Sequence, residues 1–251
     1  MRANPSSRIE ASINESRRIG GYFDIPLVDG TDWRAFDELT ESVPTINEYV
    51  NRTRAAIAQS QNVAINTIEH RVAASSFQLA TIAKLISPVF GCVVLSGTLP
   101  DFGSGNLAWR PGPKHSLDVG LVSYIGLTEI PDEDLPEKLH ANLLDGALRP
   151  LSEAIHRTTG LSSKVLSGNI ASSFNGAVSV LSAQLPNVTD RAFGLMREIV
   201  NHGCLQTTCR FVSAGDIRPR FVRNNCCLFY QLPRAGLCGD CVLAERTPRG
   251  S

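Results

Sequence analysis

The chain has 251 residues, 43% of them hydrophobic, and its 24 Lys and Arg balance its 24 Asp and Glu. A chain of this length can bury a sizeable core and does not need disulfide bonds for stability. A formal net charge of zero gives no general attraction for nucleic acid, so we expect no nucleic-acid partner.

The N-terminal residues 1–23 contain no apolar run of signal-peptide length and no small-residue cleavage site, which predicts a cytoplasmic protein. The most apolar stretch, residues 79–95, contains Lys84 and Pro88 and is shorter than the roughly 20 residues of a membrane helix. We therefore expect no transmembrane segment there, but a buried helix that runs into a turn or strand near Gly91. Peripheral association with a membrane is left open.

Helical periodicity dominates residues 31–86, with divisions near Pro44 and near residues 60–64. Two strands are predicted next, at residues 106–110 and 116–124, joined by a turn.

Three more helical patterns follow the predicted strands. They occupy residues 132–160, 161–186 and 187–203, and Gly160 suits the end of the first. After these the chain becomes irregular, with candidate strands at 208–213 and 218–230.

The pattern predicts an α+β fold, with a predominantly helical body, a small antiparallel sheet and a cysteine-bearing C-terminal appendix. We place the helical body, with its small β element, at residues 1–203 and the appendix at residues 204–251.

The cysteines are unevenly distributed, because Cys92 stands alone in an apolar run and the others crowd into the appendix. These six are Cys204, Cys209, Cys226, Cys227, Cys238 and Cys241. A disulfide framework would spread along the chain, so the clustering predicts a local site. We interpret Cys92 as a core residue, and Cys204 and Cys209 as part-buried thiols that flank a turn.

Cys238 and Cys241 form a C-x2-C pair, a spacing that lets two sulfurs turn toward one metal. Zinc sites, iron–sulfur clusters and redox dithiols all use this spacing. A redox dithiol would need a helix that starts at the motif. The short remainder of the chain, together with two competing cysteines, disfavours that use.

Cys226 and Cys227 are adjacent, and neighbouring side chains of a strand point to opposite faces. We therefore expect the chain to bend at this pair, so that both sulfurs face the loop with Cys238 and Cys241. Structural zinc sites normally space their cysteines two to four residues apart, whereas a 2Fe–2S cluster divides four thiolates between two irons. The spacing favours the cluster over zinc and leaves both open.

The segment NNCCLFYQLPRAGLCGDCVL resembles the C-terminal signature of the FhuF-like siderophore-iron reductases. These are cytoplasmic 2Fe–2S proteins that reduce ferric iron held by hydroxamate siderophores. A weaker similarity extends the resemblance over most of residues 70–243, but only the four-cysteine motif is specific.

The resemblance implies a ferric-siderophore reductase for iron acquisition, with a 2Fe–2S cluster as its cofactor. Residues 1–203 would then contain the siderophore-binding region, and residues 204–251 would hold the cluster. The implied cluster ligands are Cys226, Cys227, Cys238 and Cys241.

The resemblance requires no catalytic residue beyond the cluster. We find no flavin or nicotinamide motif in the chain, so the partners we expect are a ferric hydroxamate siderophore and an external electron donor. That donor would be a ferredoxin, a flavodoxin or a separate reductase.

Substrate or donor docking is assigned to four further side chains, which are Arg220, Arg223, Arg234 and Trp109. Guanidinium groups near the thiolates would also raise the reduction potential of a cluster. Two other functions stay open, a ferredoxin-like electron-transfer protein and a zinc-binding scaffold protein.

Overall fold

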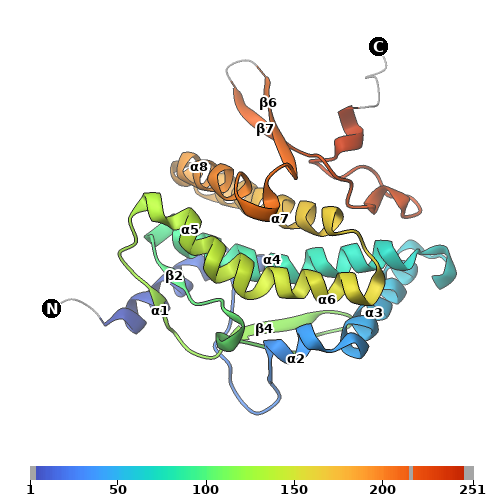
Figure 1. Ribbon diagram of the computed structural model, residues 1–251, viewed down its shortest axis with the longest axis horizontal. Helices are drawn as coiled ribbons and strands as arrows, with labels where there is room; N and C mark the ends of the chain where they lie inside the picture. Colours follow the sequence, from blue (N-terminus) through green and yellow to red (C-terminus); the bar gives the residue numbers. More distant parts are fainter. Residues whose placement is uncertain (1–3, 215–216, 246–251) are drawn as a thin grey trace.

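The computed structural model describes residues 4–214 and 217–245, and its helices pack around one long central helix, α4 (His70–Ser96) (Figure 1). Three other helices pack closely on α4. They are α1 (Pro5–Arg17), α3 (Val43–Gln61) and α7 (Ser163–Gln184). Neighbours on several sides explain why this part of the sequence is apolar around its whole circumference.

α4 does not end near Gly91 as the sequence predicted, but continues to Ser96. Val93 and Val94 favour strands, yet both are buried, and tertiary packing outweighs such propensities. The glycine has a packing role, since a Cβ built on it would overlap the hydroxyl group of Ser16 in α1. Gly91 therefore allows α1 to approach α4 closely.

α4 is also the one helix among the described residues that is long and apolar enough to cross a membrane. However, 67% of its most apolar window is buried inside the protein. The core helix of a folded domain passes the same test, so this finding is weak evidence for a membrane span.

The other helices follow the predicted order. They are α2 (Phe36–Glu41), α5 (Leu135–Leu139), a π-helical segment (His140–Leu148), α6 (Arg149–Thr159) and α8 (Thr189–Val200). Gly160 ends α6 at a φ of 68°, a left-handed conformation that glycine adopts without strain. Asn62 ends α3 in the same region of φ, within the division that the sequence predicted.

A small antiparallel sheet in the order β1-β3-β4 packs on the body. Its strands are β1 (Arg34–Ala35), β3 (Leu107–Pro111) and β4 (Leu117–Leu121). The predicted hairpin is confirmed, with Leu107 opposite Leu121 and Trp109 opposite Val119. A second pair joins β2 (Leu99–Pro100) to β5 (Gly126–Leu127). The α+β fold class is thus confirmed.

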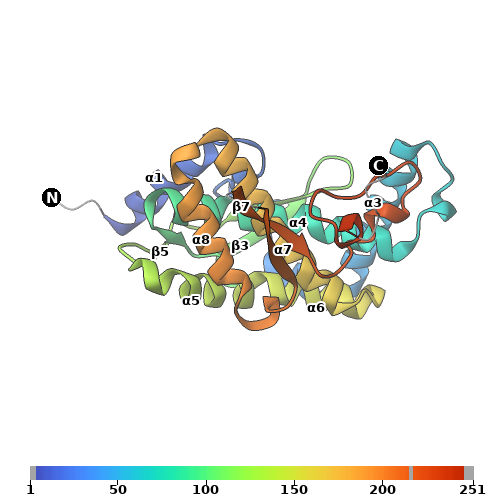
Figure 2. The same ribbon diagram turned by 90° about the horizontal axis from the view of Figure 1, so that it is seen from above.

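The appendix begins with a hairpin of β6 (Cys209–Ala214) and β7 (Ile217–Arg223), which rises beside α7 (Figure 1). Phe221 of β7 belongs to the same hydrophobic core as the body helices. After β7 the chain, red in Figure 2, crosses α4 toward α3. There Leu232 joins a smaller core with Ala58 of α3 and Val72 of α4. The cysteine-bearing segment therefore lies against the body along two helices.

Candidate metal centre

The first cysteine pair lies just beyond the end of β7. The chain leaves the extended conformation at Asn224 and Asn225, and Leu228 adopts a left-handed φ of 69°. The backbone N–H of Leu228 donates to the sulfur of Cys226 at 3.3 Å, and the hydroxyl of Ser75 donates to the carbonyl of Cys227 at 2.8 Å. The chain thus bends on either side of the cysteine pair, and the hydrogen bond from Ser75 ties the pair to α4.

The second pair sits in a tight turn, in which the N–H of Cys241 donates to the carbonyl of Cys238 at 3.1 Å. The N–H of Leu243 donates to the sulfur of Cys241 at 3.3 Å. The turn is tied to the end of β7, since the N–H of Arg223 donates to the carbonyl of Asp240 at 2.9 Å. The Asp240 carboxylate also accepts a hydrogen bond from a hydroxyl group of α7.

The two cysteine pairs meet through Cys227 and Cys238, whose sulfurs are 3.7 Å apart. The hydrogen bond between them lowers the pKa of Cys227 to about 6 and raises the pKa of Cys238, so the two sulfurs share one proton. Cys227 and Cys241 are buried, and Cys226 and Cys238 are partly exposed. Burial raises the pKa of Cys226.

Within residues 4–214 and 217–245, no three side chains of His, Cys, Asp or Glu converge closely enough to hold one metal ion. A structural zinc ion needs four ligands at a single point. A 2Fe–2S cluster needs only two protein sulfurs at each iron, so the close approach of Cys227 and Cys238 suits it better.

Arg223 carries a buried charge beside these cysteines, and its side chain is 1% exposed. Its Nη2 donates to Oδ1 of Asn169 at 2.6 Å, and its Nε donates to the carbonyl of Asn225 at 3.0 Å. Its positive charge lowers the pKa of Cys226 and Cys227. Burial has a larger effect on the pKa of Cys226, and the hydrogen bond with Cys238 has a larger effect on that of Cys227. Among the described residues no carboxylate forms an ion pair with Arg223.

A buried charge without an opposite charge is costly, and an oxidised 2Fe–2S cluster with four thiolate ligands is an anion. The buried Arg223 guanidinium therefore fits this cofactor, whose charge would balance it.

Arg223 is held by a buried polar network that joins α4 to α7. Nδ2 of Asn169 donates to the hydroxyl of Ser75 at 3.0 Å and to Oε1 of Gln78 at 2.8 Å. In α7, Gly168 leaves room for the guanidinium, because a Cβ at this position would lie 3.2 Å from Nη2. The helices thus present both the Arg223 side chain and the Cys227 carbonyl in fixed positions.

The structure places the four predicted docking residues in two different environments. Arg220 and Arg234 are exposed on the appendix. Arg223 and Trp109 are buried, which corrects their assignment to docking, since neither side chain reaches the surface. Trp109 packs edge-on against Tyr49 at 6.0 Å between ring centroids, and it belongs to the core.

The three remaining cysteines lie apart from the four-cysteine segment along the chain. Cys92 is buried in the core, as predicted, and burial raises its pKa to about 12. Cys204 is exposed in the turn Gly203–Leu205, and Cys209 begins β6. Burial raises the pKa of both of these thiols.

Sequence reasoning missed the polar residues that support the site, namely Ser75, Gln78, Asn169, Ser172 and Asp240. The first four lie on α4 and α7, far from the cysteines along the chain, and serine and asparagine are common in helices of this composition. Asp240 lies within the motif, but no spacing rule marks it as a contact to α7. The signal that could have found them is a group of polar side chains on otherwise apolar helices.

Residues 223–243 match the family model of the FhuF 2Fe-2S C-terminal domain. A search of curated proteins finds no match to the chain. The matched segment contains all four cysteines and begins at Arg223, in keeping with an FhuF-like assignment. The predicted 2Fe–2S cofactor is thereby confirmed.

Proposed function

We propose that this chain, which carries an FhuF 2Fe-2S C-terminal domain, is a cytoplasmic oxidoreductase that reduces ferric iron held by hydroxamate siderophores. The observation that carries the proposal is the four-cysteine segment of that domain, anchored around a buried guanidinium. Each Fe(III) gains one electron to become Fe(II), and an external donor protein loses one electron. Hydroxamate oxygens are hard anionic ligands, so they hold the less charged Fe(II) less tightly.

The chain's own residues would hold the cofactor and set its electrostatic surroundings. The proposed ligands are Cys226, Cys227, Cys238 and Cys241. When bound, the cluster supplies a one-electron redox centre. Backbone N–H groups that point at cysteine sulfurs, and the positive charge of Arg223, favour the state with more negative charge. These groups would raise the reduction potential.

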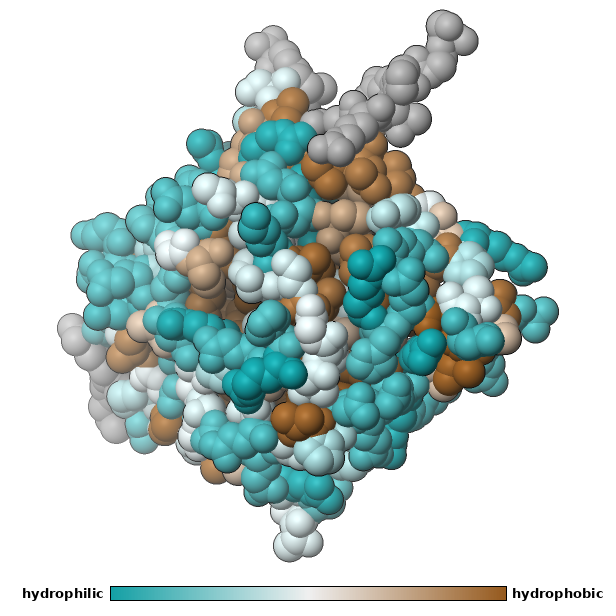
Figure 3. Space-filling view, turned by 45° about the vertical axis from the view of Figure 1, so that its right-hand side comes forward, coloured by the Kyte–Doolittle hydropathy of each residue, from teal (hydrophilic) through white to brown (hydrophobic). Residues whose placement is uncertain are grey.

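The surface around the cysteines supports exchange of electrons with other molecules. Phe229, Tyr230 and Leu237, which lie between the two cysteine pairs, are exposed. Hydrophobic surface also gathers toward the top of the molecule in the view of Figure 3. Exposed aromatic and aliphatic side chains at the edge of a redox site suit brief contact with a donor such as a ferredoxin or flavodoxin.

The proposal is tested by single-turnover reduction. Anaerobically purified protein is reduced with dithionite, freed of excess reductant and mixed with ferrioxamine B, while the visible absorption and a ferrous-specific chelator are followed. We expect reoxidation much faster than in buffer, with one Fe(II) trapped for each electron lost. The gallium(III) complex of the same siderophore serves as control, because it does not accept the electron. Reoxidation no faster than in buffer would contradict the reductase and favour a ferredoxin-like carrier.

A further inference from the structure

A cavity of about 260 Å³ lies beside the segment that joins the two cysteine pairs. Phe229 and Leu232 of that segment line it, together with residues of α3, α4 and the β3–β4 turn. Ser76 of α4 also lines the cavity, and the preceding residue, Ser75, is hydrogen-bonded to the Cys227 carbonyl. A ligand in this cavity would therefore lie next to the proposed cluster ligands.

The lining of this cavity combines cationic, neutral polar and apolar groups. The described residues that line it include no carboxylate, whereas Lys84 and His115 can each carry a positive charge. Hydroxyl or amide groups come from Thr53, Ser60, Gln61, Ser76, Thr81 and Ser116. Such a lining suits a ligand with electron-rich oxygens and a hydrocarbon framework.

His115 provides a specific reason to expect an oxygen ligand. Its Nδ1 atom is buried, and it has no hydrogen-bond partner among the residues that the structure describes. A buried polar atom without a partner is unfavourable. His115 also lines the cavity, so a turn of its ring would let the Nδ1–H tautomer donate to an oxygen of a bound molecule.

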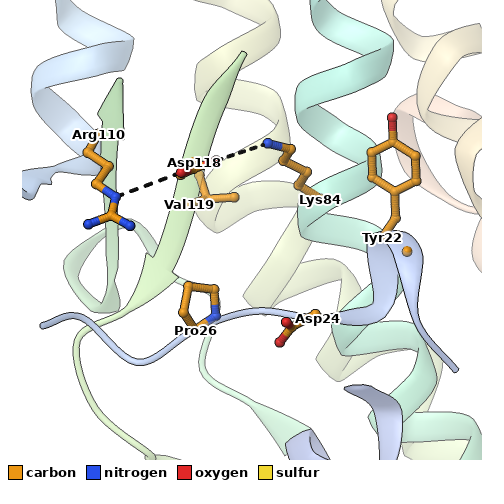
Figure 4. Close-up of a pocket in the computed structure, with 8 residues that line it drawn as sticks. Tyr22, Asp24, Pro26, Lys84, Arg110, Asp118 and Val119 are labelled. Carbon is orange, nitrogen blue, oxygen red and sulfur yellow. Dashed lines mark hydrogen bonds and ion pairs between the residues drawn. The ribbon is translucent and has the colours of Figure 1, made fainter. Parts of the chain in front are cut away.

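A second, larger cavity of about 460 Å³ is also lined by Lys84, and Figure 4 shows its side chains. There Asp118 lies between Lys84 and Arg110, and it forms ion pairs with them at 3.4 and 3.8 Å. Asp24 also lines this cavity, while none of its described lining residues belongs to the cysteine-bearing segment. The carboxylates of Asp24 and Asp118 would repel anionic oxygens in this larger cavity. The cavity also lies apart from the cysteine-bearing segment, as far as its described lining residues show.

We propose that the 260 Å³ cavity binds the metal-bearing end of a ferric hydroxamate complex, an assignment that rests on the proposed function. Hydroxamate oxygens would face His115 and the Lys84 ammonium, which has a donor left beside its contacts to Asp118 and the Leu117 carbonyl. The hydrocarbon arms would pack on Phe229 and Leu232. The volume is near the lower end of ligand pockets, roughly 300 Å³. The cavity therefore has room for the ferric ion with its oxygen ligands, and the rest of the siderophore would lie outside it.

Binding can be tested separately from electron transfer with the gallium(III) complex of desferrichrome, which has the same oxygen ligands and is not reduced. Its affinity for the oxidised, cluster-loaded protein is measured by titration calorimetry. Ala80 lines the cavity and is exposed on α4, so Ala80→Phe would fill the cavity without disturbing the core. We expect the affinity of Ala80→Phe to fall by about tenfold or more, and that of Ala80→Ser to stay unchanged.

Two further variants locate the site, and the cluster absorption spectrum of each variant verifies that it is folded. His115→Ala should weaken binding of the gallium complex. Tyr22→Ala, in the larger cavity, should leave binding unchanged. Failure of the wild-type protein to bind, or unchanged affinity in both Ala80→Phe and His115→Ala, would overturn the assignment.

These outcomes are distinguishable from failure of the proposed function. If the wild-type protein reduces ferrioxamine B while Ala80→Phe binds the gallium complex normally, the cavity assignment is wrong and the reductase stands. If the cavity variants lose binding but the wild-type protein reduces no ferric complex, the cavity assignment stands and the reductase is wrong.

Discussion

At the scale of single residues, Arg223 has the largest consequences for the site. Its guanidinium is buried among neutral oxygens of α7 and of its own segment, and its charge acts on two of the cysteines. Sequence reasoning correctly placed a guanidinium near the thiolates, but it also assigned Arg223 to docking. Burial depends on how α4 and α7 pack beneath β7, and that packing leaves no mark in the order of residues around the motif.

Replacing Arg223 with Met should weaken cluster retention by about 10- to 100-fold, the usual cost of removing a group that supports metal ligands. The reduction potential should also become more negative, because the variant loses a positive charge that stabilises the added electron. Iron content after a chelator challenge and potentiometric titration measure the two effects. Arg220→Met, on the same strand but exposed, is the matched control. Equal iron loss and equal potentials in both variants would contradict this role.

The thiols should differ in reactivity, because Cys92 is buried in the core and its pKa is raised to about 12. Cys204 is exposed, and although burial also raises its pKa, the positive charge of Arg149 opposes that rise. A thiol is reactive as its thiolate, which becomes abundant only as the pH approaches the pKa. At pH 8 we therefore expect iodoacetamide to label Cys204 and to leave Cys92 unlabelled until the protein unfolds. Peptide mass spectrometry measures both. Equal labelling in the native protein would show that the core around Cys92 opens readily.

At the scale of elements, the sequence predicted local patterns well and long-range packing poorly. The hairpin of β3 and β4 follows from alternation and a turn, both of which are local. The end of α4 was misplaced, because burial against other helices overrode the strand preference of its last turns. The second strand of the appendix was predicted to run to residue 230, but β7 ends at Arg223, where the cysteine-bearing segment turns onto the body.

Gly91 and Gly176 form a matched pair for testing the close packing of α1 on α4. Gly91→Ala would place a Cβ against the Ser16 hydroxyl of α1 and 2.9 Å from a ring carbon of Phe23, so it should destabilise the fold by about 1–3 kcal/mol. Gly176 lies in α7 with nothing within 4 Å of an added Cβ, so Gly176→Ala should be neutral or stabilising by up to about 1 kcal/mol. Denaturant unfolding of both variants measures the difference. A stabilised Gly91→Ala would contradict the close approach of α1.

At the scale of the whole molecule, the appendix is fastened to the body by hydrogen bonds from α4 and α7 and by apolar contacts of Phe221 and Leu232. The sequence predicted the cofactor correctly, because the motif that indicates it lies in one short segment. It could not identify the supporting network or the adjacent cavity, since these combine residues from α3, α4, α7 and the β3–β4 turn.

Removal of iron should loosen the cysteine-bearing segment and leave the body intact. With the cluster in place we expect trypsin to cleave slowly after Arg234, which is exposed between the two cysteine pairs. After iron removal cleavage there should accelerate, because the cluster no longer links the pairs. Time-resolved mass spectrometry measures the cut, and reconstituted protein is the control. Equal cleavage rates with and without iron would show that the protein bonds alone hold the segment.

The polar side chains of α4 and α7 that support the site also affect how the protein acquires its cofactor. Ser75, Asn169 and Ser172 sit on α4 and α7, which pack on each other and on other body helices, so folding of the body brings them close to their positions in the site. Cys226 and Cys238 are partly exposed, so one cysteine of each pair lies at the surface, where a cluster can be delivered. Maturation of this protein can therefore be a late step, in which a preassembled cluster is transferred to a chain that has already folded.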